Sequence, residues 1–413
     1  MAEKALTTQK NNKRPKAYPP GADGKLLDVA SGIGRAKWIT AILLAVCVVL
    51  CVVFAGDELS VYNVQYLLKH FDVNSEGNSG NFTTLNYESD ATYAFGYYKD
   101  DFVIVNSSDI DYYDMKGNSV MSNNIFMSDP QVITTEKYLF VYDQGNVSYS
   151  VYDSFFNVKS DVTDYPIRYL AASDEGSYAI VTRDIEYRGA VLVYDKSFNL
   201  KNEIYKDKLV FSAAFASDGS RLAILSAETS ERGEFYTEIQ SVVPGKGEAE
   251  FTKVIEDCFP VSAGYFDNGR LGVLCQDRFI VFDKDGEQVG EYLFYDSVPT
   301  ACAFNGGNAV VSFSENVIGV ESLLKVFDDG ASVKSEAIID GQVKKIIVDE
   351  TYAYTLLTDA VARTSLSDGF SAYEYTESNP LDVLVRDEGS LLLCYGNHVD
   401  SVQYAFTGVN EEE

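Results

Sequence analysis

The chain has 413 residues, of which 46% are hydrophobic and 13% aromatic, and this composition excludes a disordered protein. Its 62 Asp and Glu residues outnumber the 33 Lys and Arg residues, which gives a formal net charge of −29. Because so acidic a chain repels phosphates, we exclude nucleic acid as a partner.

Residues 1–37 contain Lys, Pro and Gly without apolar periodicity, which predicts a disordered basic cytoplasmic tail. Residues 38–56 follow with nineteen uncharged positions, enough for a transmembrane helix of roughly 28 Å. The side chains that we expect to anchor this helix in the lipid bilayer are Trp38, Ile42, Leu43, Leu44, Val48, Val49, Leu50, Val52, Val53 and Phe54.

The charge balance reverses across this segment. Residues 1–37 hold eight Lys and Arg against three Asp and Glu, whereas the rest of the chain holds twenty-five against fifty-nine. Positive residues favour the cytoplasmic side, so we expect a cytoplasmic N-terminus and an extracytoplasmic C-terminal domain. The basic region is too long for an ordinary cleaved signal peptide, which favours a single-pass anchor in the plasma membrane.

Residues 57–81 read as a stalk and linker, residues 82–407 as the folded domain, and residues 408–413 as an acidic tail. The domain repeats one element, in which two apolar strands flank a tight turn. The clearest turns are Asp218-Gly219 and Asn268-Gly269, which are hairpin signals because these residues tolerate positive φ. Eight such turns lie near residues 100, 136, 175, 218, 268, 306, 350 and 388.

A second repeated element is a strand that ends in an aromatic residue followed by Asp. Its copies are Tyr113-Asp114, Tyr152-Asp153, Tyr194-Asp195, Phe282-Asp283 and Phe327-Asp328. The element resembles the aromatic–Asp pair of WD-type repeats, in which the aromatic ring packs between sheets and Asp closes a turn.

Three to four strands in about 40 residues, repeated eight times, predict an all-β fold, a β-propeller preceded by the transmembrane helix. Eight blades are favoured and seven are possible. The last unit, Leu381–Phe406, contains only three strands, so we expect Phe82–Tyr87 to supply its fourth and to close the ring.

Four cysteines lie in the domain, at Cys258, Cys275, Cys302 and Cys394. They lack the spacing of a zinc site, so we expect buried free thiols, with one disulfide among Cys258, Cys275 and Cys302 as the alternative.

Other candidate sites have weaker signals. His398 and Asp400 share a strand face, but no nucleophile motif accompanies them. Carboxylates at Asp109, Asp111 and Asp114, and at 283–286, could bind calcium, although hairpin turns explain them better. The tyrosines Tyr87, Tyr93, Tyr97, Tyr98, Tyr112 and Tyr113 suggest packing between blades, or else a contact surface for a peptide or glycan. We therefore expect no catalytic residue, no metal and no cofactor.

From Lys37 to Phe406 the chain resembles an uncharacterised bacterial family, a domain of unknown function with WD-repeat-like or quinoprotein-like propellers. The residues that carry the resemblance are Tyr142-Asp143-Gln144-Gly145 and the turns at 173–177 and 217–220. The family's members are expected to be single-pass membrane proteins, so the resemblance implies the outer face of the plasma membrane. It implies no catalytic residue.

These observations favour a non-catalytic binding or scaffold module at the cell envelope, with an envelope protein or a glycan as partner. The insertions at 229–235 and 243–251 are the expected specificity elements. The alternatives are an enzyme with a central pocket, and an envelope-assembly factor that adds client strands to a sheet edge.

Overall fold

The computed structural model describes residues 37–46, 49, 82–88, 92–154, 156–230, 233–295, 297–314, 321–376, 378–387 and 389–404. Two compact units divide the chain, Met1–Leu67 and Leu68–Glu413. In the first unit, residues 37–46 are helical. The exposed large apolar side chains of this unit include the expected anchors Trp38, Ile42, Leu43, Leu44 and Val49.

Among the described residues, no helix has both the length and the apolar character that crossing a membrane requires. The other expected anchor residues, Val48, Leu50, Val52, Val53 and Phe54, lie outside the described part of the chain, as do the stalk and the acidic tail.

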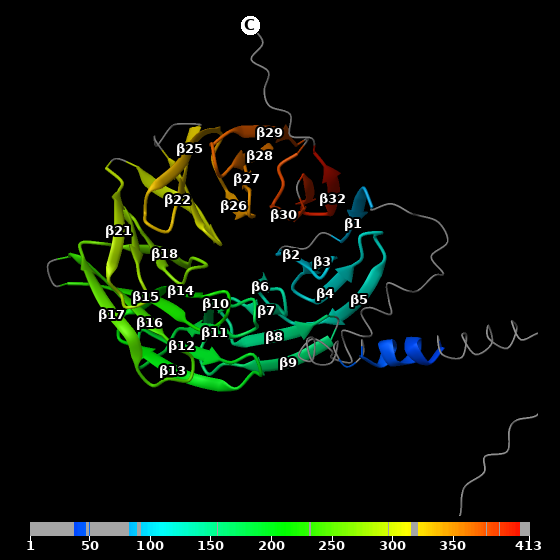
Figure 1. Ribbon diagram of the computed structural model, residues 1–413, viewed down its shortest axis with the longest axis horizontal. Coiled ribbons are helices and arrows are strands. Elements are labelled where there is room, and N and C mark those ends of the chain that lie inside the picture. The colour runs from blue at the N-terminus through cyan, green and yellow to red at the C-terminus, as the bar shows by residue number, and fades with distance from the viewer. Residues whose placement is uncertain are drawn as a thin grey trace, which may run out of the picture. The chain divides into compact units, whose positions relative to one another are not determined.

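The second unit consists of four-stranded antiparallel sheets, the blades, arranged in a ring (Figure 1). Blades 1 to 4 are formed by β2 (Ala94–Tyr98), β3 (Asp101–Val105), β4 (Asp109–Tyr113) and β5 (Ser119–Asn124); by β6 (Pro130–Thr134), β7 (Leu139–Asp143), β8 (Ser148–Asp153) and β9 (Phe156–Val162); by β10 (Ile167–Ala172), β11 (Tyr178–Thr182), β12 (Gly189–Tyr194) and β13 (Leu200–Lys206); and by β14 (Leu209–Phe215), β15 (Leu222–Thr229), β16 (Phe235–Val242) and β17 (Ala249–Glu256).

Blades 5 to 8 continue the order. They are formed by β18 (Pro260–Tyr265), β19 (Leu271–Cys275), β20 (Arg278–Phe282) and β21 (Gln288–Leu293); by β22 (Val298–Asn305), β23 (Asn308–Ser314), β24 (Glu321–Phe327) and β25 (Val333–Asp340); by β26 (Lys345–Val348), β27 (Tyr352–Leu356), β28 (Ala360–Ser365) and β29 (Ser371–Tyr375); and by β30 (Asp382–Asp387), β31 (Ser390–Cys394), β32 (His398–Gln403) and β1 (Thr84–Asn86). The prediction of an eight-bladed propeller is confirmed, and the seven-bladed alternative is wrong.

The ring closes through its first strand. In blade 8 the strand order is β30, β31, β32 and then β1, so the N-terminal strand forms the outer edge of the C-terminal blade (Figure 1). Thr84, Leu85 and Asn86 pair with Asp400, Val399 and His398 of β32. The sequence predicts this closure because the last repeat contains only three strands.

Strand position within a blade explains the sequence patterns. Second strands such as β3, β7, β11, β19 and β31 are buried along their whole length because neighbouring blades cover both of their faces. Outer strands such as β17 alternate partly buried and exposed residues, since only one face meets another blade. The apolar clusters that result pair each blade with the next, and one of them joins Leu384 and Leu392 of blade 8 to Phe95 and Phe102 of blade 1.

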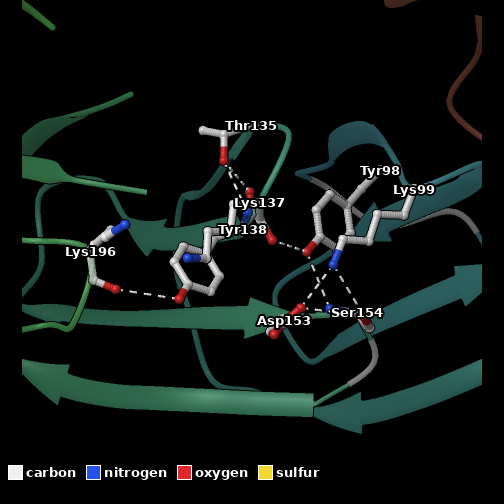
Figure 2. Close-up of polar contacts among 8 residues, drawn as sticks. All are labelled: Tyr98, Lys99, Thr135, Lys137, Tyr138, Asp153, Ser154 and Lys196. Atoms are coloured by element: carbon white, nitrogen blue, oxygen red, sulfur yellow. Dashed lines mark hydrogen bonds and ion pairs between the residues drawn. The ribbon is translucent and has the colours of Figure 1, made fainter. Parts of the chain in front are cut away.

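Hydrogen bonds also join adjacent blades. The Tyr98 hydroxyl of blade 1 donates to the Lys137 carbonyl of blade 2 at 2.6 Å, and the Tyr138 hydroxyl of blade 2 lies 3.4 Å from the Lys196 carbonyl of blade 3 (Figure 2). These tyrosines pack as apolar rings while their hydroxyls reach the turns of the next blade.

Antiparallel pairing places the connections on two faces of the ring. The turn face carries the connections between first and second strands and between third and fourth strands. The pocket face carries the connections between second and third strands and those between successive blades. The eight predicted turns all fall between the first and second strands, on the turn face.

Candidate binding face and its pockets

Exposed apolar side chains distinguish the pocket face from the turn face. Among the described residues, the connections of the pocket face contain the exposed large apolar side chains of Phe126, Ile185, Tyr187, Tyr295 and Leu381. Three of these are almost fully exposed, at 89% for Phe126, 86% for Ile185 and 87% for Tyr295. In the described connections of the turn face, Phe370 is the one such side chain. Exposed apolar residues gathered on one face indicate an interaction surface.

A cavity of about 600 Å³, pocket A, opens on the pocket face between blades 2, 3 and 4. Its lining comprises Gln144, Gly145, Pro166, Ile167, Arg168, Tyr169, Arg183, Leu209 and Phe211. The walls are therefore mostly apolar, with two guanidinium groups among them. The hydroxyl of Tyr169 is buried and has no hydrogen-bond partner in the described structure, and burial raises the pKa of this tyrosine.

The first strands of four consecutive blades are bulged near the pocket face. The register shifts fall between Ile167 and Tyr169, Val210 and Ser212, Pro260 and Ser262, and Pro299 and Ala301. The extra residues are Arg168, Phe211, Val261 and Thr300. A bulge redirects the side chain of its extra residue, and two of these residues, Arg168 and Phe211, line pocket A.

A second cavity of about 340 Å³, pocket B, opens on the same face between blades 4, 5 and 6. Phe235, Phe259, Asp257 and Asp277 are among the residues that line it. The ring of Phe259 lies 4.9 Å from that of Phe211 in pocket A and 5.2 Å from that of Phe235. Phe211, Phe259 and Phe235 thus form an aromatic ridge that joins the two pockets.

Charged side chains beside pocket A differ in whether they are neutralised. Lys206 and Lys208 both contact Glu238, each at 2.7 Å. Burial alone would raise the pKa of Glu238, but hydrogen bonds from the two lysines outweigh it and lower that pKa. Among the described residues, by contrast, the side chains of Arg168 and Arg183 form no ion pair or hydrogen bond, so their charges remain available at the pocket.

The signature aspartates lie on different faces. Asp195, Asp283 and Asp328 follow third strands, and each accepts hydrogen bonds from two backbone N–H groups of the turn that it begins. Asp153 instead pairs with Lys99 of blade 1 at 2.8 Å (Figure 2). Asp143 ends a second strand on the pocket face, where it accepts from the N–H groups of Ser128 and Asp129.

The two clearest hairpin turns adopt the positive-φ backbone conformation that their glycine residues favour. Gly219 and Gly269 adopt φ values of +68° and +79°. Asp218 accepts from the N–H of Ser220, and Asn268 accepts from the N–H of Arg270.

The structure brings His398 and Asp400 together, with Nε2 and Oδ2 at 3.6 Å. The His398 ring stacks on Tyr395, and its Nδ1 contacts the side chain of Asn397. No hydroxyl or thiol side chain in the described structure hydrogen-bonds to this ring. No group of three acidic, His or Cys side chains among the described residues is placed to hold a metal.

Cys258 and Cys275 form a disulfide, with their Cα atoms 6.3 Å apart. The expectation of free thiols is therefore wrong for this pair, while Cys302 and Cys394 are free. The hairpin of β18 and β19 explains the pairing, since Pro260 lies opposite Cys275. Burial raises the pKa of both free thiols.

The two insertions of blade 4 do not form one surface. Most of each insertion lies in a connection, the first between β15 and β16 on the pocket face and the second between β16 and β17 on the turn face. Only the first reaches a pocket, through Phe235. The tyrosine group packs between blades: Tyr98 and Tyr112 are buried between blades 1 and 2, while Tyr87, Tyr93, Tyr97 and Tyr113 pack where blade 8 meets blade 1.

A family model matches residues 80–403, which is most of the chain, and its description is "Family of unknown function (DUF5711)". The chain belongs to this family. Among curated protein sequences, none matches the DUF5711 chain.

Solved structures show the same fold as the DUF5711 domain at low identity. BamB from Moraxella catarrhalis has 11% identity and a TM-score of 0.54, over 78% of this chain and 99% of BamB. A eukaryotic initiation factor has 11% identity and a TM-score of 0.52, over 79% of this chain and 93% of that one. The WD40 domain of Neurospora crassa Pan2 has 10% identity and a TM-score of 0.50, over 79% and 97%. At these identities the likeness concerns the fold alone.

Proposed function

We propose that this protein is a membrane-anchored, extracytoplasmic and non-catalytic binding module whose pocket face docks a protein of the cell envelope. The observation that carries the proposal is the concentration of exposed apolar side chains and of pockets A and B on one face of a rigid ring. Aromatic residues at the centre of such a face are the side chains that most often dominate binding energy.

Two features support the compartment. The uncharged segment 38–56 follows a basic tail, which is the pattern of a helix inserted with its N-terminus inside the cell. The Cys258–Cys275 disulfide belongs to an oxidising environment, because disulfides are rare where thiols are kept reduced.

The sheet edges weigh against strand addition as the main activity. The outer strands β13 and β17 carry exposed charged residues along their free edge, including Lys201, Glu203, Glu250 and Glu256. Charged side chains on an edge strand discourage pairing with another chain. The pocket face is therefore the better candidate for a partner.

Site-specific photo-cross-linking in intact cells tests the proposal. A photoreactive phenylalanine analogue at Tyr295 probes the pocket face, and the same analogue at Phe370 probes the turn face. We expect one discrete cross-linked envelope protein from Tyr295 and none from Phe370, because only the first position lies on the apolar face.

Cross-links of equal yield from both positions would contradict a specific docking face.

Alkaline extraction of the membranes tests the membrane anchor. Release of the protein by carbonate would contradict the anchor, whereas retention together with external protease sensitivity would support it.

A further inference from the structure

We infer that pocket A receives an acidic side chain from an extended segment of the docked protein, and that the apolar residues following it lie across the aromatic ridge. This inference rests on the proposed function and specifies the chemistry of the partner. It assigns Arg168 and Arg183 as the residues that bind the carboxylate.

Three of the described arginines, Arg168, Arg183 and Arg188, form no ion pair or hydrogen bond through their side chains, and two of these three line pocket A. Among the described arginines, Arg221, Arg270 and Arg278 form ion pairs with carboxylates, while Arg363 stacks on an aromatic ring. Arg386 contacts the ring and the hydroxyl of Tyr97. In a chain with 62 acidic residues, two arginines that line one cavity without a carboxylate partner leave the site open to an acidic ligand.

The backbone holds the two arginines at the same mouth. The N–H of Arg183 donates to the Pro166 carbonyl at 2.9 Å, and Ile167 pairs with Thr182. Arg168 is the bulged residue that follows, so it adopts a position that a regular strand would not give it. A guanidinium group binds a carboxylate through parallel hydrogen bonds, and such charge-assisted bonds are stronger than neutral ones.

The neighbouring ridge specifies what accompanies the carboxylate. Two ring-to-ring steps of 4.9 and 5.2 Å lead from Phe211 in pocket A to Phe235 in pocket B. About three residues of an extended chain would cover this path. Because the surface continues beyond pocket A, the carboxylate is better supplied by an internal Asp or Glu than by a chain terminus.

The chain's own acidic C-terminus is not the expected occupant. Tyr404, the last described residue, hydrogen-bonds to the Gly389 carbonyl on the turn face. Pocket A opens on the opposite face, in blades far from blade 8 along the ring. A partner in trans is therefore the simpler source of the carboxylate.

Fluorescence anisotropy with the full-length chain tests the inference. The probe is a labelled peptide with blocked ends and the sequence Gly-Glu-Leu-Phe-Leu-Gly, and its matched control replaces Glu by the isosteric Gln. We expect saturable binding of the Glu peptide that is at least about tenfold tighter than that of the Gln peptide. Arg168→Gln and Arg183→Gln should each remove this preference.

Arg188→Gln is the matched protein control, because it removes the same charge from the same connection but does not line pocket A. It should change the affinity for the Glu peptide by less than about twofold. Phe211→Ala should weaken both peptides alike, since it alters the ridge and not the charge. Circular dichroism checks that each variant is folded.

Equal affinity for the two peptides, or no saturable binding of either, would overturn the inference. A cross-linked partner at Tyr295 without any preference for the Glu peptide would support the docking face and contradict only the carboxylate site. A preference for the Glu peptide that depends on Arg168 and Arg183, without any cross-linked partner at Tyr295, would support the carboxylate site and contradict the docking face.

Discussion

At the end of β12, the carboxylate of Asp195 accepts hydrogen bonds from the N–H groups of Ser197 and Asn199 and pairs with Lys201 at 2.8 Å. Desolvation opposes ionisation, but these contacts outweigh it and lower the pKa of Asp195 to about 2. Because the folded pKa lies below the unfolded value, the ionised group stabilises the fold above about pH 4 and loses this contribution as the pH falls toward 2.

Asp195→Asn should therefore lower the free energy of unfolding by about 1 kcal/mol at pH 7, and by less at pH 3. Urea unfolding at the two pH values measures the difference. Lys201→Met serves as the companion variant, since it removes the ion pair and should reduce the pH dependence. A difference between wild type and Asp195→Asn that is the same at both pH values would contradict this role.

At the scale of the element, β1 decides whether the ring is closed. A chain that begins at Phe82 keeps β1, whereas one that begins at Tyr93 exposes the edge of β32 and part of the cluster between blades 8 and 1. We expect the shorter chain to unfold at a lower urea concentration and to self-associate, because a free strand edge pairs with other chains. Equal urea midpoints and equal sizes by light scattering would show that β1 is dispensable.

At the scale of the whole molecule, the cysteines report where the protein resides. If the domain is extracytoplasmic, alkylation of the denatured, unreduced protein should label Cys302 and Cys394 but not Cys258 or Cys275. Mass spectrometry locates the label. Labelling of all four would contradict an oxidising compartment.

The same disulfide should contribute to stability. It closes a loop with a sequence separation of 17. In the unfolded-chain entropy model, loss of such a cross-link lowers the free energy of unfolding by about 3 kcal/mol. Reduction should therefore lower the melting temperature. Cys258→Ser with Cys275→Ser provides the control, since reduction should leave its melting temperature unchanged.

The sequence predicts what local chemistry determines. Turns such as Asn268-Gly269 have the same physical requirement wherever they occur, so their spacing reveals the repeats and favours eight blades over seven. The missing strand of the last blade likewise indicates how the ring closes.

Pocket A could not be predicted in this way. Gln144, Arg168 and Leu209 come from three blades, and their proximity depends on the ring and on bulges that have no clear sequence signal. The disulfide, by contrast, could have been predicted from the sequence, because a hairpin centred on Gly269 brings Cys258 and Cys275 close together.

The closing strand is also the point at which the chain enters the propeller. Phe82 hydrogen-bonds to Met115 on the turn face, and β1 follows directly. Any mechanical pull that reaches the propeller through its N-terminal end is therefore borne by the Phe82–Met115 hydrogen bond and then by the three residue pairs between β1 and β32. A load large enough to peel β1 away would open the ring at the same moment, so resistance to force and integrity of the fold depend on one short strand.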